Sequence, residues 1–158
     1  MIKNIDKVLE QVLNIVSSAG GTVFSFYGTD FDIKDKGNDS PVTQADIASN
    51  EVLVERLRKF GWPILSEEGV DDDDRFGASL VWIIDPLDGT KDFIQETGEF
   101  TIMVGLVEKQ DNGTYRPIFG VIYQPVTKTF YYATKNGGAY IKNKKMLRRL
   151  NVSSESQW

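Results

Sequence analysis

The sequence contains neither cysteine nor histidine in its 158 residues. Without cysteine the chain can form no disulfide, thiolate nucleophile or thiolate zinc site, and this composition suits a reducing compartment. Without histidine it lacks the most frequent general base and a common metal ligand. Any chemistry would therefore depend on carboxylates, hydroxyls, lysines and hard metal ions. Because the composition suits a reducing compartment, we expect a cytoplasmic protein.

Positive charge and long apolar runs are also scarce. The formal net charge is −5 and the isoelectric point is about 4.8, which indicates no basic surface for duplex nucleic acid or an anionic membrane. The N-terminal segment interrupts its apolar residues with Asp6 and Glu10, unlike a secretory signal, and no run is long enough to span a bilayer. Binding of a small anionic substrate is still compatible with this charge, provided that a cation masks the local negative charge.

Hydrophobic patterning indicates one α+β domain in which two long helices pack on a largely antiparallel sheet. Helical spacing predicts a helix from Ile5 toward Phe26, and a capping box at residues 43–46 opens a second helix that Gly61 ends. Extended or strand patterns cover residues 31–35, 63–66, 80–84, 100–107, 118–123, 130–133 and 139–142. Residues 100–107 and 118–123 are almost continuously apolar, as we expect for strands that are covered on both faces. The last segment, from residue 142, predicts no closing element.

The letters DPLDGT at 85–90 carry the clearest chemical signal. A buried strand delivers Asp85, Pro86 fixes a turn and Asp88 follows, so two carboxylates and the Leu87 carbonyl can converge on one point. Such an oxygen-only set suits Mg²⁺, which retains several waters and leaves positions for a phosphate. The residues after Gly89 predict a short helix whose free N–H groups favour a bound phosphate.

Each of the acidic residues also has a structural explanation. Asp85 and Asp88 would cap backbone N–H groups in a turn, and Asp46 would reach back to the first residue of the second helix. Glu67 and Glu68 would lie in a solvated loop. The context favours a site, because four carboxylates that follow adjacent strands would repel one another without a cation.

Three segments, taken in order, resemble the inositol monophosphatase superfamily: DSPVTQAD at 39–46, LSEE at 65–68 and WIIDPLDGTKDF at 82–93. The similarity continues through GEFT at 98–101 and GVIYQP at 120–125, so it extends over nearly the whole chain. Within the superfamily, the lysine after DGT and the acidic residue that follows it are more similar to the 3′(2′),5′-bisphosphate nucleotidase branch.

The resemblance implies a phosphomonoesterase that hydrolyses 3′-phosphoadenosine 5′-phosphate to AMP and phosphate. It implies two or three Mg²⁺ ions in a complete site, with Mn²⁺ as an alternative. The implied catalytic residues are Asp46, Thr90 and Glu67, the implied metal ligands are Glu67, Asp85, Leu87 and Asp88, and the implied substrate contacts are Gly89, Thr90 and Lys36. Lys36 would otherwise be an ordinary surface lysine.

The resemblance implies a layered αβαβα fold of which residues 1–158 supply the N-terminal metal-binding domain. Members of the family continue into a C-terminal α/β domain that adds a further aspartate after a tryptophan, whereas this sequence ends at Trp158. We therefore expect that domain to be absent, the isolated chain to be inactive or much impaired, and an apolar face to favour self-association. Two other functions stay open: a sugar-phosphate phosphatase of inositol monophosphatase type, and a catalytically inactive metal-binding or assembly domain.

Overall fold

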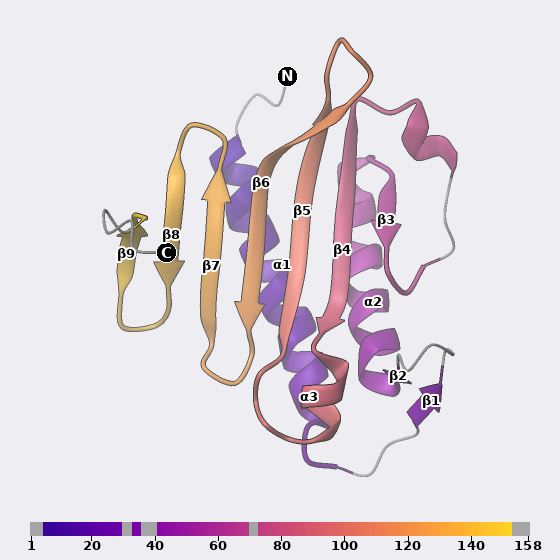
Figure 1. Ribbon diagram of the computed structural model, residues 1–158, viewed down its shortest axis with the longest axis vertical. Coiled ribbons are helices and arrows are strands. Elements are labelled where there is room, and N and C mark those ends of the chain that lie inside the picture. Colours follow the sequence, from indigo (N-terminus) through magenta and orange to yellow (C-terminus); the bar gives the residue numbers. More distant parts are fainter. Residues whose placement is uncertain (1–4, 30–32, 36–40, 70–72, 153–158) are drawn as a thin grey trace, which may run out of the picture.

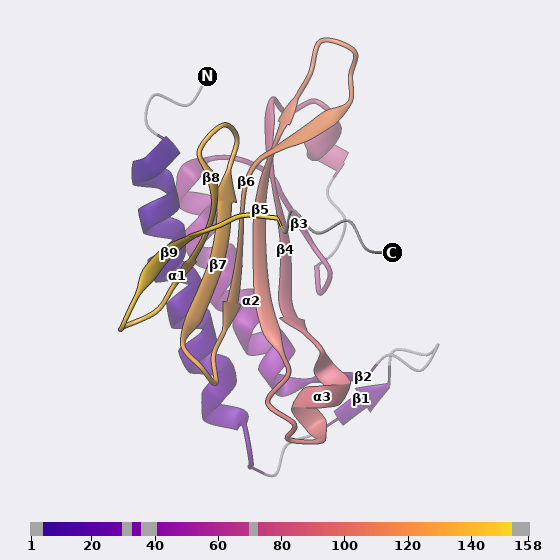
Figure 2. The ribbon, with the colours of Figure 1, turned by 60° about the vertical axis from the view of Figure 1, so that its left-hand side comes forward.

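The fold consists of two long helices that cover one face of a seven-stranded sheet. A computed structural model of the chain describes residues 5–29, 33–35, 41–69 and 73–152. Figure 1 shows α1 (Ile5–Phe26) and α2 (Gln44–Leu57) behind the strands, and the turned view of Figure 2 keeps both on that side. The predicted α+β fold is therefore confirmed. No helix among the described residues is both long and apolar enough to cross a membrane.

The two helices form where the apolar spacing predicts them. α1 buries Leu9, Val12, Val16 and Val23 along one stripe. At the start of α2, the Thr43 hydroxyl accepts from backbone N–H groups of the first turn, and the Asp46 carboxylate accepts from the Thr43 N–H at 2.8 Å. A short 3₁₀ turn (Arg58–Phe60) follows α2, and Gly61 ends it with a left-handed φ of 74°.

The main sheet has its strands in chain order. Its members are β3 (Ile64–Ser66), β4 (Leu80–Asp88), β5 (Thr101–Lys109), β6 (Tyr115–Gln124), β7 (Thr129–Thr134), β8 (Gly138–Lys142) and β9 (Leu147–Leu150). β3 runs parallel to β4, and every later neighbour pair is antiparallel. A separate hairpin pairs β1 (Ile33–Asp35) with β2 (Pro41–Thr43). Two short helices, η2 (Asp73–Phe76) and α3 (Thr90–Ile94), flank β4.

The two faces of the sheet differ sharply in burial. On the helix side, Trp82, Leu106 and Phe119 are buried in a continuous core with the apolar stripes of α1 and α2. On the opposite side, β5 and β6 place Met103, Gly105, Gly120 and Ile122 along a broad hollow of about 840 Å³. Neither long helix covers this second face, which we call the open face.

The structure corrects two expectations from the sequence and adds one strand. The segment after residue 142 does contain a closing element, because β9 pairs with β8 and forms the edge of the sheet. β2 was not predicted, since its three residues depend on pairing with β1. The expectation that residues 100–107 and 118–123 are covered on both faces is wrong for the described chain, where Ile122 is 40% exposed on the open face.

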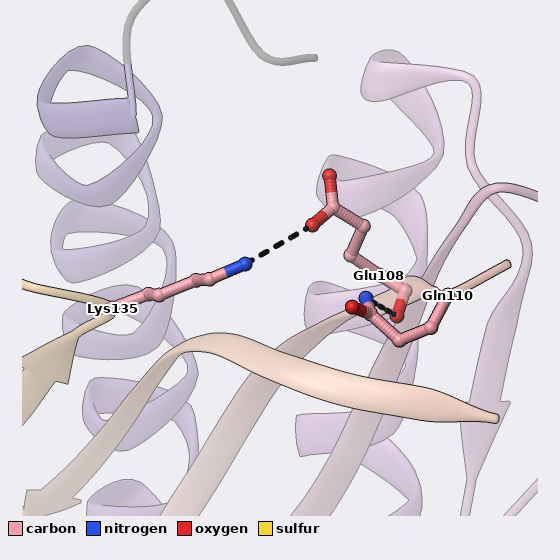
Figure 3. Close-up of polar contacts among 3 residues, drawn as sticks. All are labelled: Glu108, Gln110 and Lys135. Atoms are coloured by element: carbon pink, nitrogen blue, oxygen red, sulfur yellow. Dashed lines mark hydrogen bonds and ion pairs between the residues drawn. The ribbon is translucent and has the colours of Figure 1, made fainter.

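Polar contacts at the far end of the sheet add little to this core. Figure 3 shows the Lys135 ammonium facing the Glu108 carboxylate, with Nζ and Oε2 3.6 Å apart, while the Gln110 amide donates to the Glu108 carbonyl at 3.0 Å. Both charged side chains are partly solvated. Pairs of this kind contribute about 0–1 kcal/mol, so the apolar layer between helices and sheet dominates stability.

Candidate metal centre

A β-bulge near the end of β4 brings two aspartates to the same face of the sheet. In a regular strand, residues three apart point to opposite faces. Here Asp85 pairs with Met103 and Asp88 pairs with Thr101, so two residues of β4 lie opposite the single residue Ile102. Met103 and Thr101 are two apart on β5 and share a face. The extra residue therefore turns both carboxylates toward the open face.

Glu67 reaches the same place from the neighbouring strand. β3 is parallel to β4, with Ser66 level with Ile84, and the Glu67 N–H donates to the Ile84 carbonyl at 3.2 Å. In this parallel register, the residue after Ser66 lies level with the residue after Ile84. Glu67 and Asp85 are therefore neighbours at the same edge of the sheet. Glu67 thus comes close enough to Asp85 to affect its pKa, although the two residues lie far apart in the sequence.

The electrostatics of Asp85 reflect this crowding. Burial, followed by the negative charges of Glu67 and Asp88, raises the pKa of the Asp85 carboxyl from 3.8 to about 7. A hydrogen bond from the Leu87 N–H to Asp85 Oδ1, at 3.1 Å, acts in the opposite direction. The structural explanation, that Asp85 caps a turn, is therefore correct for one of its oxygens, although burial and the neighbouring carboxylates still disfavour its charged form.

A second polar network joins α2 to the start of α3. Thr90 Oγ1 lies 3.2 Å from Asp46 Oδ1 and 3.2 Å from the Leu87 carbonyl oxygen, and can donate its proton to either. The other carboxylate oxygen of Asp46 accepts from the Thr43 N–H and hydroxyl. Asp46 thus caps its own helix with one oxygen and faces Thr90 with the other, although it is only 2% exposed.

Gly89 makes the tight connection between β4 and α3. Its φ is +87°, which an L side chain rarely adopts, and an added Cβ would lie 2.8 Å from the Glu99 carbonyl oxygen. Only glycine therefore fits between the bulge and the strand beside it. α3 begins at the next residue, as predicted from the sequence, so its first turn lies at the end of β4 (Figure 1).

Two polar residues of α2 that the sequence did not single out also contact this region. Ser49 Oγ donates to the Pro86 carbonyl at 2.7 Å, and Ser66 Oγ donates to Asn50 Oδ1 at 2.7 Å. These partners lie 37 and 16 residues apart along the chain. No local pattern predicts contacts at such separations, so they required the three-dimensional fold.

The donor set fits a hard divalent cation. Within the described ranges, no three carboxylate side chains converge closely enough to hold an ion by themselves. Burial and the neighbouring Glu67 and Asp88 carboxylates raise the pKa of Asp85, and the Leu87 carbonyl adds a further oxygen to this oxygen-only set of donors. Lys36 lies outside the described residues.

Comparison with known proteins places the chain in a family. The sequence profile of the inositol monophosphatase family matches residues 4–157. A 3′(2′),5′-bisphosphate nucleotidase CysQ of Salmonella typhimurium is 40% identical over 133 residues, which are 81% of this chain and 52% of that protein. The chain thus spans about half the length of the curated relatives it matches.

Solved structures give the same result for the fold. The structure of CysQ from Bacteroides thetaiotaomicron, a bacterial member of the inositol monophosphatase family, covers 98% of this chain at 33% identity, with a TM-score of 0.70 over 55% of that protein. The IMPase of Thermotoga maritima covers 94% at 25% identity, with a TM-score of 0.81 over 54% of its own chain. By its sequence profile, its relatives and its two-helix, seven-stranded fold, the chain belongs to the inositol monophosphatase family.

Proposed function

We propose that this chain carries the cation-binding and water-activating part of a Mg²⁺-dependent phosphomonoesterase whose substrate is 3′-phosphoadenosine 5′-phosphate. The observation that supports it most directly is the bulge of β4, which turns Asp85 and Asp88 to one face beside Glu67. The substrate is proposed from the relatives at 33–40% identity, which are named bisphosphate nucleotidases. A cytoplasmic location remains part of this proposal.

In this proposal Glu67, Asp85, Asp88 and the Leu87 carbonyl bind two or three Mg²⁺ ions, with Mn²⁺ as an alternative. A bound divalent cation lowers the pKa of a water ligand and offsets the negative charge of the transferring phosphoryl group. The carboxylates suit this role because their attraction to a bound cation would offset their mutual repulsion.

Thr90 and Asp46 would orient the attacking water. When Thr90 donates its proton to Asp46 Oδ1, its oxygen is left to accept a hydrogen bond from a water molecule. Asp46 is held in place by the Thr43 contacts of the capping box. The water oxygen would then form the new bond to phosphorus while the bond between phosphorus and the 3′-oxygen of the nucleotide breaks. The water loses a proton and the 3′-oxygen takes one up, giving phosphate and AMP.

The phosphate itself would lie against the first turn of α3. We propose that the backbone N–H groups of Gly89 and Thr90 contact its oxygens, since the bulge ends at that point and the left-handed Gly89 leaves no side chain in the way. Lys36 stays a candidate phosphate contact that the described residues do not test.

An inositol monophosphatase-type substrate is the second candidate. The fold overlaps the Thermotoga maritima IMPase with a TM-score of 0.81, against 0.70 for the Bacteroides thetaiotaomicron CysQ. Sequence identity has the opposite order, at 25% and 33%. Because substrate choice depends on specific contacts and not on overall backbone similarity, we give more weight to the identity.

Phosphate release with excess Mg²⁺ tests the proposal, comparing 3′-phosphoadenosine 5′-phosphate with inositol 1-phosphate before and after EDTA. Preferential EDTA-sensitive release from the nucleotide would support the nucleotidase function, and preference for inositol 1-phosphate would replace it with the second candidate. Release that EDTA leaves unchanged would contradict both.

The 158-residue chain by itself is expected to be inactive or much impaired in this assay, because it spans about half the length of its relatives. Metal-dependent turnover by the isolated chain would show that expectation to be wrong while supporting the phosphatase function. If turnover is absent but the chain binds Mg²⁺, the proposal of a cation site is still supported. This result would favour an inactive metal-binding or assembly domain as the function of this chain alone.

A further inference from the structure

We propose that Ser49 and Asn50, two consecutive residues of α2, are positioning residues that hold the ends of β4 and β3 in the arrangement a small cation requires. The inference rests on the proposed function, because it concerns the same carboxylates. Neither side chain is itself a ligand in this account. Each acts through a backbone or side-chain contact with the segment that presents a carboxylate.

Ser49 contacts the bulge at its centre. Its side chain is completely buried, and its hydroxyl donates to the Pro86 carbonyl at 2.7 Å. Pro86 and Leu87 are the two residues that oppose the single Ile102, so this carbonyl belongs to the irregular part of the ladder. Pro86 also has no N–H with which to pair. A donor from α2 therefore satisfies a buried acceptor where regular strand pairing is interrupted.

The consequence for the carboxylates is geometric. Asp85 and Asp88 share a face only because the bulge inserts one residue between their ladder positions. If the bulge relaxes or shifts by one residue, one of the two carboxylates leaves that face. The hydrogen bond from Ser49 fixes the bulge from the helix side, opposite to the face on which the carboxylates lie.

Asn50 makes the corresponding contact with β3. Its Oδ1 accepts from the Ser66 hydroxyl at 2.7 Å, and the same hydroxyl oxygen lies 3.3 Å from the Glu68 N–H, which donates to it. Glu67 lies between those two residues. α2 thus holds the residue before Glu67 through Asn50 and the residue after Asp85 through Ser49. The helix sets the distance between the two ligand-bearing ends in addition to the short parallel pairing of β3 with β4.

A purely structural role for these contacts makes a different prediction. A buried hydroxyl needs a partner wherever it lies, and a hydrogen bond of this kind contributes about 1 kcal/mol to stability without any effect on a ligand. Cation selectivity separates the two roles. Mg²⁺ demands near-ideal octahedral geometry, whereas Ca²⁺ accepts longer distances and variable coordination. Loss of positioning should therefore weaken Mg²⁺ binding more than Ca²⁺ binding.

The test is calorimetric titration of the unmodified chain, Ser49→Ala and Thr129→Val with Mg²⁺ and with Ca²⁺. Thr129 is the control because it is also buried, at 6% exposure, and its hydroxyl also donates to a backbone carbonyl, that of Thr127, in the turn before β7. We expect Ser49→Ala to weaken Mg²⁺ binding by about 10-fold or more, as partners of metal ligands commonly do, with a smaller loss for Ca²⁺. Thr129→Val should leave both affinities unchanged.

Equal losses for the two cations, or none, in a folded Ser49→Ala variant would overturn the inference while leaving the cation site intact. If Ser49→Ala does not fold, Asn50→Ala replaces it, because Asn50 is only half-buried. The loss of Mg²⁺ affinity is again compared with the loss of Ca²⁺ affinity. If the unmodified chain binds neither cation, the proposed function fails and this inference fails with it. Failure of the proposed function is seen in the unmodified chain, whereas failure of this inference alone is seen only in the variants.

Discussion

Asp85 links the chemistry of the site to the stability of the chain. Its pKa is raised from 3.8 to about 7, first by burial and then by Glu67 and Asp88. Between those pH values the folded chain keeps a proton that the unfolded chain has lost. The free energy of unfolding therefore contains a contribution from Asp85 that is complete below about pH 4 and lost as the pH rises through about 7.

The corresponding prediction concerns Asp85→Asn. In EDTA, the unmodified chain should lose stability from pH 4 to pH 7 relative to this variant, because asparagine cannot ionise. Urea unfolding at several pH values measures the difference between the two proteins, which removes the effect of other titrating groups. A difference that is constant across this range would contradict the assigned burial and charge of Asp85.

The sequence proposed candidate site residues, whose roles stay predictions. Glu67, Asp85 and Asp88 were proposed because they follow apolar strands, whereas the catalytic role of Asp46 came from the family resemblance. The sequence offered helix capping and catalysis as alternatives for Asp46, whereas the structure gives its two oxygens separate partners, Thr43 and Thr90. It could not find Ser49, whose contact spans 37 residues.

At the scale of elements, two consecutive glycines in α1 have opposite environments. Gly20 is buried, and an added Cβ would overlap the ring of Tyr123, which is itself stacked on Phe130 with centroids 4.3 Å apart. Gly21 is exposed, and an added Cβ would meet nothing within 4 Å. Gly20 therefore permits the close approach of α1 to β6, while Gly21 has no packing role.

Alanine at these two positions should change stability in opposite directions. Gly21→Ala should raise the free energy of unfolding by about 0.5–1 kcal/mol, since alanine restricts the unfolded chain and favours a helix. Gly20→Ala should lower it by about 1–3 kcal/mol through overpacking against Tyr123. Urea unfolding of both variants checks the pair, and a stabilising Gly20→Ala would show that α1 does not lie as close to β6 as described.

Periodicity located nearly all of the helices and strands because each buries a stripe or a face. It placed α1 and the start of α2 correctly and found the central strands. It missed β9, which is a short edge strand with the exposed residues Arg148 and Arg149. It also ended β4 at residue 84, because a proline after the apolar run suggests a turn, whereas the strand continues through the bulge to Asp88.

At the scale of the whole molecule, the open face remains the main unsatisfied surface. Met103, Ile122 and Tyr131 lie on it from three adjacent strands, and Gly105 and Gly120, two residues away along β5 and β6, line the same hollow. Apolar faces of this extent favour association. The expectation of self-association that came from the sequence therefore has a specific location on β5, β6 and β7.

Two isoleucines with equal exposure provide a matched test. Ile122 on the open face and Ile47 on α2 are both 40% exposed. We expect the chain to associate with increasing concentration in sedimentation equilibrium, and Ile122→Lys to reduce this association by placing a charge in the interface. Ile47→Lys should have no such effect. A monomer at all concentrations, or equal effects of the two substitutions, would contradict the assignment of this surface.

Calorimetric titration of the chain with Mg²⁺ tests the central claim most directly, because it measures the cation site independently of turnover. The account predicts saturable binding by the unmodified chain and a loss of most of the affinity in Asp88→Asn, which removes one carboxylate that the bulge brings beside Asp85. Absence of binding in the folded, unmodified chain, or unchanged affinity in Asp88→Asn, would contradict the claim that the end of β4 forms a metal centre.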